Sequence, residues 1–278
     1  MAVQIASLNS GSNGNCYYIG NGTDAVLVDA GISCRETERR LKSLDLHTSR
    51  IRAIFISHEH SDHISGLRVL SAKYQLPVYI TEATQRGCPA GINPTLVNRF
   101  ATGEPVKLGS LSIFPFRKEH DANDPHSFVV ESGSVRIGVF TDIGTSCERV
   151  VEQFRRCHAV FLESNYDPQM LKNGSYPYVL KKRISGGNGH LSNEEALELY
   201  LQHRSRFLSH LILSHLSQQN NTPEIVEKLF QPHGSGRTIF VASRYEPSPL
   251  FEVNGNLVFP DSPRKSRSSP ASGQLSLF

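Results

Sequence analysis

Residues 54–66 read IFISHEHSDHISG, and four side chains that commonly bind metals fall within six of these positions. They follow an apolar, β-branched run, Ile54-Phe55-Ile56, which is typical of a buried strand. A helical pattern of apolar residues begins soon after them, at Leu67. The sequence therefore predicts a ligand-bearing loop at the carboxyl end of a strand, where a rigid scaffold can hold it. Its candidate ligands are His58, His60, Asp62 and His63.

The spacing of these residues suits two metal ions. Residues i and i+2 of an extended segment point the same way, so His58 and His60 can direct two imidazoles at one point. Asp62 and His63 are adjacent at a turn into a helix and can direct their side chains at a second point. Imidazole and carboxylate suit zinc, manganese or iron. Two ions about 3.5–4 Å apart can clamp a displacement reaction and activate the water between them. A polar loop of solvated histidines is the weaker interpretation, because four ligands cluster here.

Length and composition indicate a folded protein. The chain has 278 residues, 38% of them hydrophobic and 20% charged, which suffices for one large domain or two small ones. It shows neither an apolar run long enough to span a membrane nor the pattern of a signal peptide. Its five cysteines include no Cys-x-x-Cys pair, so we expect reduced thiols and a cytoplasmic protein. A net charge of +3 does not predict nucleic-acid binding, which would need a local basic patch.

Strand and helix patterns alternate along the chain. Serine followed by glutamate three residues later predicts helix starts at Ser33 and Ser192, and Thr222-Pro223 predicts a third. The first helix should end near Leu44, and one helix should follow the central loop as far as Gln75. Residues 167–187 give no clear pattern. Strands are expected at 3–8, 16–19, 25–28, 54–56, 78–81, 95–100, 106–108, 111–116, 127–131, 134–140, 159–162, 209–213 and 238–242, and a closing hairpin at 251–258.

Candidate ligands recur where these predicted strands end. A sheet that presents ligands from its strand ends is a sensible scaffold for two metals. With H-x-H-x-D-H after a strand, the sequence resembles the metallo-β-lactamase superfamily. This resemblance implies an α/β fold, a four-layer αββα sandwich of two mixed sheets with helices outside. The strand-end candidates are Asp29, His58, His60, His120, Asp142, Glu163 and His215.

The resemblance also implies a division of the ligands between two divalent ions, Zn or Mn. His58, His60 and His120 would hold one ion, and Asp62, His63 and His215 the other. Asp142 would bridge them, while Asp29 and Glu163 would lie behind the ligands. His126 competes with His120 for its role. The histidines at 60 and 63 resemble those of the two-metal hydrolases rather than the oxygen-reducing members or the lactamases with a cysteine ligand.

A closer resemblance covers most of residues 6–221. The segments GSNGNCYYI, SHEHSDHISGL, ESNYDPQML and SHLSQQNN resemble the bacterial YycJ/WalJ group of metallo-β-lactamase-fold nucleases. This resemblance implies 5′→3′ exonuclease action on double-stranded DNA in replication or repair. Tyr166 departs from members that carry histidine at that position, which leaves its role open.

Phosphodiester cleavage gives several polar residues a role. Asp62 and Asp142 would be catalytic through the metals. His190 precedes a capped helix start, where backbone amides attract anions, and an imidazole can give a proton to the leaving oxygen near neutral pH. Alternatively, it packs as a structural loop histidine. The basic run of Lys181, Lys182 and Arg183 would contact the DNA backbone or form a solvated surface.

The composition changes at residue 261. Residues 1–260 should form the nuclease domain and residues 261–278 a polar, basic, disordered tail. The last five residues match a bacterial sliding-clamp binding peptide, so the clamp is an expected partner beside DNA. They are Gln274, Leu275, Ser276, Leu277 and Phe278.

Three other functions fit the sequence. An RNA-processing nuclease resembling the tRNA 3′-processing enzymes would use the same sheets and metals. A glyoxalase-type esterase or thioesterase would not need the basic clusters. A regulatory or scaffolding protein would use only the fold and the tail, and the intact ligand set speaks against it.

Overall fold

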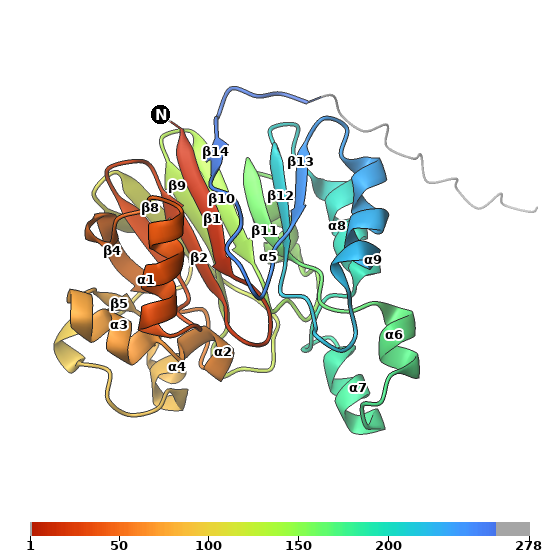
Figure 1. Cartoon of the computed structure of the whole chain (residues 1–278), viewed down its shortest axis with the longest axis horizontal. Coiled ribbons are helices and arrows are strands. Elements are labelled where there is room, and N and C mark those ends of the chain that lie inside the picture. Colours follow the sequence, from red (N-terminus) through yellow and green to blue (C-terminus); the bar gives the residue numbers. More distant parts are fainter. Residues whose placement is uncertain (1, 260–278) are drawn as a thin grey trace, which may run out of the picture.

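The computed structural model describes residues 2–259 of the chain. Two seven-stranded sheets pack face to face, and helices cover their outer faces (Figure 1). The predicted αββα sandwich is confirmed. The predicted tail and its last five residues lie outside the described residues, so the domain boundary at residue 260 stays a prediction.

The first sheet contains the amino-terminal strands. Its order is β14-β1-β2-β3-β4-β5-β6, with parallel pairing from β3 to β6. Parallel pairing places the carboxyl ends of β3 and β4 at the same edge. The strands are β1 (Val3–Asn9), β2 (Cys16–Gly20), β3 (Ala25–Val28), β4 (Ile51–Phe55), β5 (Val78–Tyr79), β6 (Val97–Asn98) and β14 (Phe251–Val253).

The second sheet has the order β13-β12-β11-β10-β9-β8-β7 and is parallel from β10 to β13. The carboxyl ends of β10, β11 and β12 therefore also share an edge. The strands are β7 (Val106–Leu108), β8 (Leu111–Arg117), β9 (His126–Ser132), β10 (Val135–Phe140), β11 (Ala159–Glu163), β12 (His210–Ser214) and β13 (Thr238–Val241).

Helices connect the strands and form the outer layers. Three short 3-10 helices lie at Thr48–Arg50, Pro94–Leu96 and Gln231–His233. None of the helices within residues 2–259 combines the length and apolarity that a membrane span requires. The α-helices are α1 (Cys34–Ser43), α2 (Ser61–Ile64), α3 (Leu67–Tyr74), α4 (Glu82–Gly87), α5 (Glu148–Phe154), α6 (Pro168–Asn173), α7 (Tyr178–Ile184), α8 (Asn193–His203) and α9 (Pro223–Phe230).

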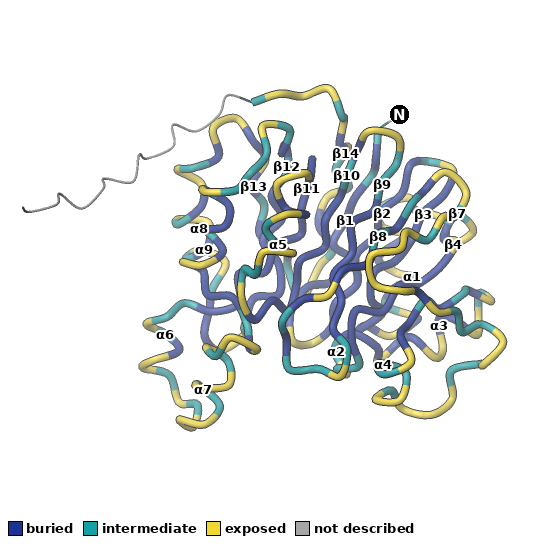
Figure 2. Tube along the Cα trace, turned by 180° about the vertical axis from the view of Figure 1, so that it is seen from behind, coloured by how far each residue is buried: buried dark blue, intermediate teal, exposed yellow. Residues whose placement is uncertain are grey.

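Strand β4 shows why an apolar run forms these layers. Ala53 and Phe55 belong to the core between the two sheets, whereas Ile54 belongs to the core between the first sheet and its helices. Successive strand residues face opposite sides, so a strand covered on both sides needs consecutive apolar residues. Figure 2 shows the buried strands beneath more exposed outer segments. Each large apolar side chain buried here contributes about 1.5–3 kcal/mol before ordering costs.

Helix starts follow the expected caps with one difference. The Ser192–Glu195 capping box is complete at the start of α8. At α1, the Ser33 hydroxyl accepts a hydrogen bond from the Glu36 amide, but the Glu36 carboxylate pairs with Arg39 and Arg40. The α1 box is therefore half formed, because the arginines hold the glutamate away from the cap.

The helix expected from Leu67 as far as Gln75 is confirmed as α3, and the short helix α2 precedes it. Two sequence predictions of structure were wrong. Residues 251–258 do not form a hairpin, because β14 pairs with β1 and residues 254–258 contain no strand. The strand expected at 95–100 is only β6, preceded by a 3-10 helix. Residues 167–187, which had no predicted structure, contain α6 and α7.

Candidate metal centre

The candidate site lies where both sheets present the carboxyl ends of their parallel strands. Asp29 follows β3, and the loop that carries His58 follows β4. From the second sheet, Asp142 follows β10, Glu163 ends β11 and His215 follows β12. The two halves of the sandwich therefore meet at this site, at the strand ends where ligands bind in open α/β sheets.

Three histidines form the first cluster. His58 and His120 are buried, and His60 is partly exposed. Nε2 of His58 lies 3.0 Å from Nδ1 of His60. The ring of His120 lies 4.9 Å from that of His58 and 5.2 Å from that of His60, measured between centroids. One nitrogen from each ring lies within 4.8 Å of the others, which is close enough for a shared ion.

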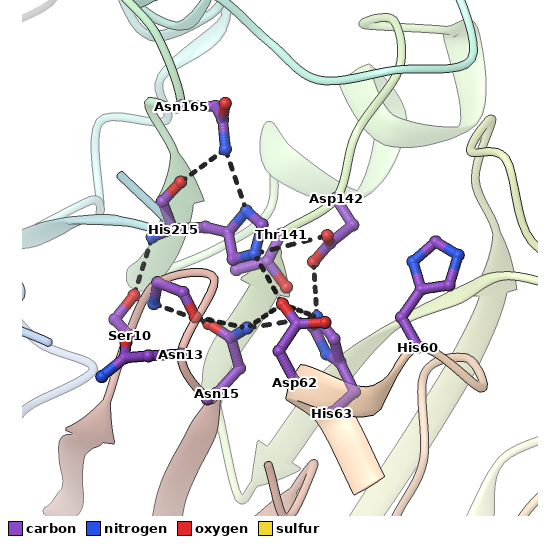
Figure 3. A network of polar contacts seen from close by, with 12 residues as sticks. Ser10, Asn13, Asn15, His60, Asp62, His63, Thr141, Asp142, Asn165 and His215 are labelled. Atoms are coloured by element: carbon purple, nitrogen blue, oxygen red, sulfur yellow. Dashed lines mark hydrogen bonds and ion pairs between the residues drawn. The ribbon is translucent and has the colours of Figure 1, made fainter. Parts of the chain in front are cut away.

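Asp62, His63 and His215 form the second cluster (Figure 3). Oδ2 of Asp62 lies 3.5 Å from Nε2 of His63 and 3.4 Å from Nε2 of His215. His63 and His215 are buried, and the side chain of Asp62 is 19% exposed. The structure thus brings together the residues predicted for the second ion.

Asp142 lies between the two clusters. Its Oδ1 is 3.7 Å from Nε2 of His120 in the first cluster and 3.5 Å from Nε2 of His215 in the second. Its Oδ2 is 3.2 Å from Nε2 of His63. A carboxylate in this position can reach an ion in either cluster, as expected of a bridging ligand.

The donor atoms fit divalent metal ions. Nε2 of His120 and Oδ2 of Asp142 are buried and make no hydrogen bond of good geometry within residues 2–259; the ionisable groups around them, Asp121, Asp142 and His63, lie at ion-pair distances of 3.2–3.7 Å. Buried polar atoms without such hydrogen bonds are unusual and call for an ion or a comparable ligand. Nitrogen and carboxylate oxygen together suit zinc or manganese better than calcium or magnesium. The fold and the clustered donors therefore point to divalent metal binding.

Hydrogen bonds on Nδ1 turn the Nε2 atoms of four histidines toward the centre. His63 donates from Nδ1 to Asp29 over 2.8 Å, and His120 Nδ1 lies 3.0 Å from the carbonyl of Gly189. Such bonds fix the tautomer and direction of a ligating imidazole. His58 and His215 are held in the same manner, by Ser57 and Glu163.

Asp29 supports ligands of both clusters. Besides accepting from His63, its carboxylate accepts from the Ser57 hydroxyl over 2.9 Å. That hydroxyl lies 2.9 Å from Nδ1 of His58. Because Ser57 donates its proton to Asp29, its oxygen is available to accept from His58. Asp29 thus contacts His63 directly and reaches His58 through Ser57, a link that the sequence did not reveal.

Glu163 connects the second cluster to His190. Its Oε1 lies 2.8 Å from Nδ1 of His190 and 3.0 Å from Nδ1 of His215. Its Oε2 accepts from the amides of Ile143 and Leu191. Glu163, His190 and His215 could also hold an ion together with Asp142. The carboxylate's existing bonds to ring nitrogens and amides favour an orienting role, which leaves Nε2 of His190 directed away from Glu163.

Two asparagines that sequence reasoning missed also contact the candidate ligands. Nδ2 of Asn15 lies 3.2 Å from Oδ2 of Asp62 and 3.1 Å from Nε2 of His63 (Figure 3). Nδ2 of Asn165 donates to the carbonyl of His215 over 2.8 Å. Both lie in segments that resemble the nuclease group, GSNGN and ESNYD, and those matches were the signal that could have singled them out.

The backbone turns sharply at the strand ends. Asp29, Asp142 and His215 have φ angles of 62°, 54° and 59°, in the left-handed region that few residues other than glycine and asparagine adopt. Gly31 must be glycine for a different reason, because a Cβ there would lie 1.6 Å from the carbonyl oxygen of Asp62. The backbone at Gly31, which ends the VDAG segment, therefore lies directly against the backbone at Asp62 in the HSDH segment.

Burial and charge act differently on the two clusters. Burial lowers the pKa of His58 well below its ordinary value and lowers that of His120 to about 4. Burial also opposes the charged forms of His63 and His215, but Asp142 and the neighbouring carboxylates outweigh it. They raise the pKa of His63 well above its ordinary value and that of His215 to about 10. The second cluster is thus the more negative environment, which favours a cation.

A pocket opens over the centre. Arg183 reaches its wall from α7 and pairs with Asp121, while Ser12 and Ser217 lie among its other lining residues. His190 is 22% exposed, so its side chain is accessible from this pocket. Lys181 and Lys182 line a separate groove. The competing candidate His126 is buried beside Thr102 and belongs to none of the clusters in the described chain.

Comparison with known proteins assigns the fold to a family. A model of the β-lactamase superfamily domain matches residues 24–215. The chain belongs to the metallo-β-lactamase superfamily. It is 33% identical over 243 residues to exodeoxyribonuclease YycJ of Bacillus anthracis, covering 85% of this chain and 92% of that protein. Exodeoxyribonuclease WalJ of Streptococcus pneumoniae is 31% identical over 223 residues, covering 78% and 83% respectively.

A solved structure shares the fold of this chain. The metallo-β-lactamase fold protein YhfI of Bacillus subtilis aligns with a TM-score of 0.69 at 18% identity, covering 90% of this chain and 99% of that one. The predicted resemblance to the YycJ/WalJ group is confirmed, as is the prediction of a metal-dependent hydrolase.

Proposed function

We propose that this protein is an exodeoxyribonuclease that degrades double-stranded DNA from 5′ to 3′ in the cytoplasm, during replication or repair. The observation that carries the proposal is the pair of donor clusters joined by Asp142 beneath an open pocket. Relatives similar over most of the chain carry the name exodeoxyribonuclease, which supports DNA as the substrate.

Two divalent ions, Zn or Mn, would occupy the clusters. His58, His60 and His120 would hold one ion, Asp62, His63 and His215 the other, and Asp142 would contact both. Bound ions of this kind neutralise phosphate charge and make a water molecule nucleophilic at neutral pH. The chain's own part is to hold these donors rigidly, through the Asp29, Ser57 and Glu163 hydrogen bonds.

His190 would complete the cleavage reaction. Attack of water on phosphorus breaks the bond to the 3′ oxygen of the terminal nucleotide, and that oxygen needs a proton. The carboxylate of Glu163 accepts from Nδ1 of His190 over 2.8 Å, so the ring is oriented with Nε2 free to face a substrate. Partial exposure in the pocket allows the contact with substrate that a proton donor requires.

Basic residues would hold the DNA backbone. Arg183 lies at the wall of the catalytic pocket, where its side chain is 60% exposed and pairs with Asp121. A phosphate could replace Asp121 as its partner, because the exposed ion pair contributes little stability. Lys181 and Lys182 precede Arg183 on the same helix and would contact the backbone nearby.

The tail would bring the enzyme to its substrate. Gln274, Leu275, Ser276, Leu277 and Phe278 match the sliding-clamp binding peptide in sequence. Docking of Leu275, Leu277 and Phe278 in an apolar cleft would contribute about 1.5–3 kcal/mol per side chain before ordering costs. Tethering would raise the local concentration of the nuclease on DNA that carries a clamp.

Digestion of end-labelled duplexes tests the activity. Purified protein with Mn²⁺ or Zn²⁺ is incubated with blunt DNA duplexes labelled at either the 5′ or the 3′ end. We expect early release of the 5′ label as a mononucleotide, late release of the 3′ label, and no release by a His60→Ala variant. Faster digestion of a matched RNA duplex would favour RNA processing. Hydrolysis of a thioester without nuclease action would favour a glyoxalase-type enzyme.

A further inference from the structure

Helices α6 and α7 form a projecting hairpin beside the catalytic pocket. Both views show this hairpin extending from the body on the side of α8 and α9 (Figures 1 and 2). Tyr178 and Val179, at the start of α7, are 77% and 78% exposed. Large apolar side chains exposed together on a projecting element indicate a contact surface, because their exposure to water is unfavourable unless a partner covers them.

The two sides of α7 line two different hollows. Leu180, Arg183 and Ile184 line the catalytic pocket. Lys181, Lys182 and Ser185 line a second groove, whose opposite wall comes from α6 and the segment before it. Residues three and four apart share a helix face, so these two sets form separate stripes. Helix α7 is therefore a partition between the catalytic pocket and the groove.

The groove suits a nucleic-acid strand. Its lining contains three lysines, at positions 172, 181 and 182, and no acidic residue among those described. Tyr178, which is 77% exposed, adds an aromatic ring to the same lining, whereas Tyr166 is buried. Cationic side chains along a groove with aromatic rings are the combination that binds single-stranded nucleic acid, through phosphates and stacked bases. Charge complementarity thus selects an anionic partner over an apolar one, and the exposed ring of Tyr178 favours an anion that carries flat bases.

We propose that α7 divides the two strands of a duplex end, with the cleaved strand in the catalytic pocket and the complementary strand in the groove. This inference rests on the proposed action on DNA. A helix with its side chains is about 10–12 Å across, close to the roughly 12 Å width of a major groove. Strands on either side of α7 are therefore separated without a large displacement. Tyr178, at the exposed start of the helix, faces the last base pair.

Variants of the groove test this division. The double variant Lys172→Ala/Lys182→Ala removes two charges from exposed positions. The control Lys42→Ala/Lys107→Ala removes two from α1, beside the first sheet, and from β7, at the far edge of the second sheet. Each protein is assayed on a blunt duplex, on the single strand of the same sequence, and on bis(p-nitrophenyl) phosphate. Duplex binding is measured against salt with Asp142→Asn added to prevent cleavage.

We expect the groove variant to lose about 10-fold in kcat/KM on the duplex and to keep its rates on the single strand and the small ester. The slope of log binding constant against log salt concentration should fall by the amount expected for about two lost phosphate contacts. Tyr178→Ala should weaken duplex cleavage similarly, and Tyr178→Phe should restore it, because the ring supplies the stacking. Lys172→Arg/Lys182→Arg should also retain activity.

Other outcomes would overturn the division of strands. Equal losses of activity on duplex and single strand would mean that the groove binds DNA without distinguishing the two strands. Equal losses in the Lys42/Lys107 control would mean that the effect comes from the protein's net charge and not from the groove. If the wild-type protein cleaves the small ester but binds and degrades no DNA, the proposed nuclease function fails together with this inference. If it degrades duplex DNA and the groove variants behave as wild type, only the inference fails.

Discussion

Oε1 of Glu163 lies 2.8 Å from Nδ1 of His190, and the same oxygen lies 3.0 Å from Nδ1 of His215. One buried carboxylate thus supports the proposed proton donor and a predicted metal ligand. Burial opposes its charge, but the two histidines outweigh this effect and lower its pKa to about 2. The proton donor and the second cluster are therefore coupled through a single side chain.

Replacing His190 should separate catalysis from metal binding. We expect His190→Ala to keep its metal content and to cleave DNA about 10²–10⁴-fold more slowly, because the leaving oxygen loses its proton donor. A substrate with a p-nitrophenolate leaving group should recover much of the rate. His47→Ala is the matched control, because His47 is exposed and lies before the start of β4, whereas the site follows the end of that strand. Loss of metal in the His190 variant would make this residue a ligand instead.

Replacing Glu163 should weaken both functions. Glutamine can still accept from the amides of Ile143 and Leu191, but its amide cannot accept from two ring nitrogens. We expect Glu163→Gln to lose about 10–100-fold in activity or metal affinity, as is usual for residues behind metal ligands. Titration with Mn²⁺ followed by kinetics measures both quantities. A loss confined to metal affinity, with full rate at saturating metal, would separate Glu163 from His190.

Asp142→Asn removes the charge between the clusters while keeping a side chain that tolerates the left-handed backbone. We expect at least a 10-fold loss of affinity for one ion, and loss of most activity, because the donor shared by both clusters is weakened. Asp45→Asn is a close control, since Asp45 is exposed and has a φ of 55° against 54° for Asp142. Two bound ions with full activity in Asp142→Asn would contradict the bridging assignment.

Asp24 predicts a pH-dependent contribution to stability. Hydrogen bonds from the Ser110 amide and hydroxyl, and then the Arg52 guanidinium, lower its pKa to about 2. The unfolded value is higher, so the folded protein favours the charged form. This stabilisation is present above about pH 4 and is lost as the pH falls through 2.

We therefore expect Asp24→Asn to lower the free energy of unfolding by about 2 kcal/mol at pH 7, with a shrinking difference from wild type between pH 4 and 2. Denaturant unfolding in the presence of a chelator measures this difference without contributions from metal binding. A difference that stays constant over that range would assign the loss to packing rather than charge.

The clamp peptide is tested by truncation. Full-length protein and a form ending at Gly273 are titrated against purified sliding clamp. We expect only the full-length form to bind, reversibly, because three apolar side chains and Gln274 supply the contact. Leu277→Ala/Phe278→Ala in the full chain should abolish binding without changing activity on clamp-free DNA. Equal affinity of both forms would remove the tail from the account.

Sequence alone could predict the strand-end ligands because each local pattern has one structural meaning. The run before His58 had to be a strand buried on both sides, and Ser192 with Glu195 had to start a helix. The closing hairpin failed because the Asn254-Gly255 turn signal is local, whereas β14 is placed by long-range pairing with β1. The start of α6 was readable, since Asp167 caps a helix whose first residue is Pro168.

The supporting residues of the site were harder to predict. Asn15 stands in a glycine-rich stretch that resembles an ordinary turn, and its contacts to Asp62 and His63 span 47 and 48 residues. Ser57 gave no signal because serine commonly ends a strand. Such roles depend on which distant loops meet, and one sequence does not contain that information.

At Asp29, Asp142 and His215, the left-handed backbone creates a conflict between enzymatic activity and the free energy of unfolding. Backbone held in such regions costs on the order of 1–3 kcal/mol per residue and persists only where the surroundings enforce it. Glycine would relieve that cost at each position while deleting the functional side chain. A screen for heat-resistant variants of this protein would therefore tend to enrich substitutions that inactivate it.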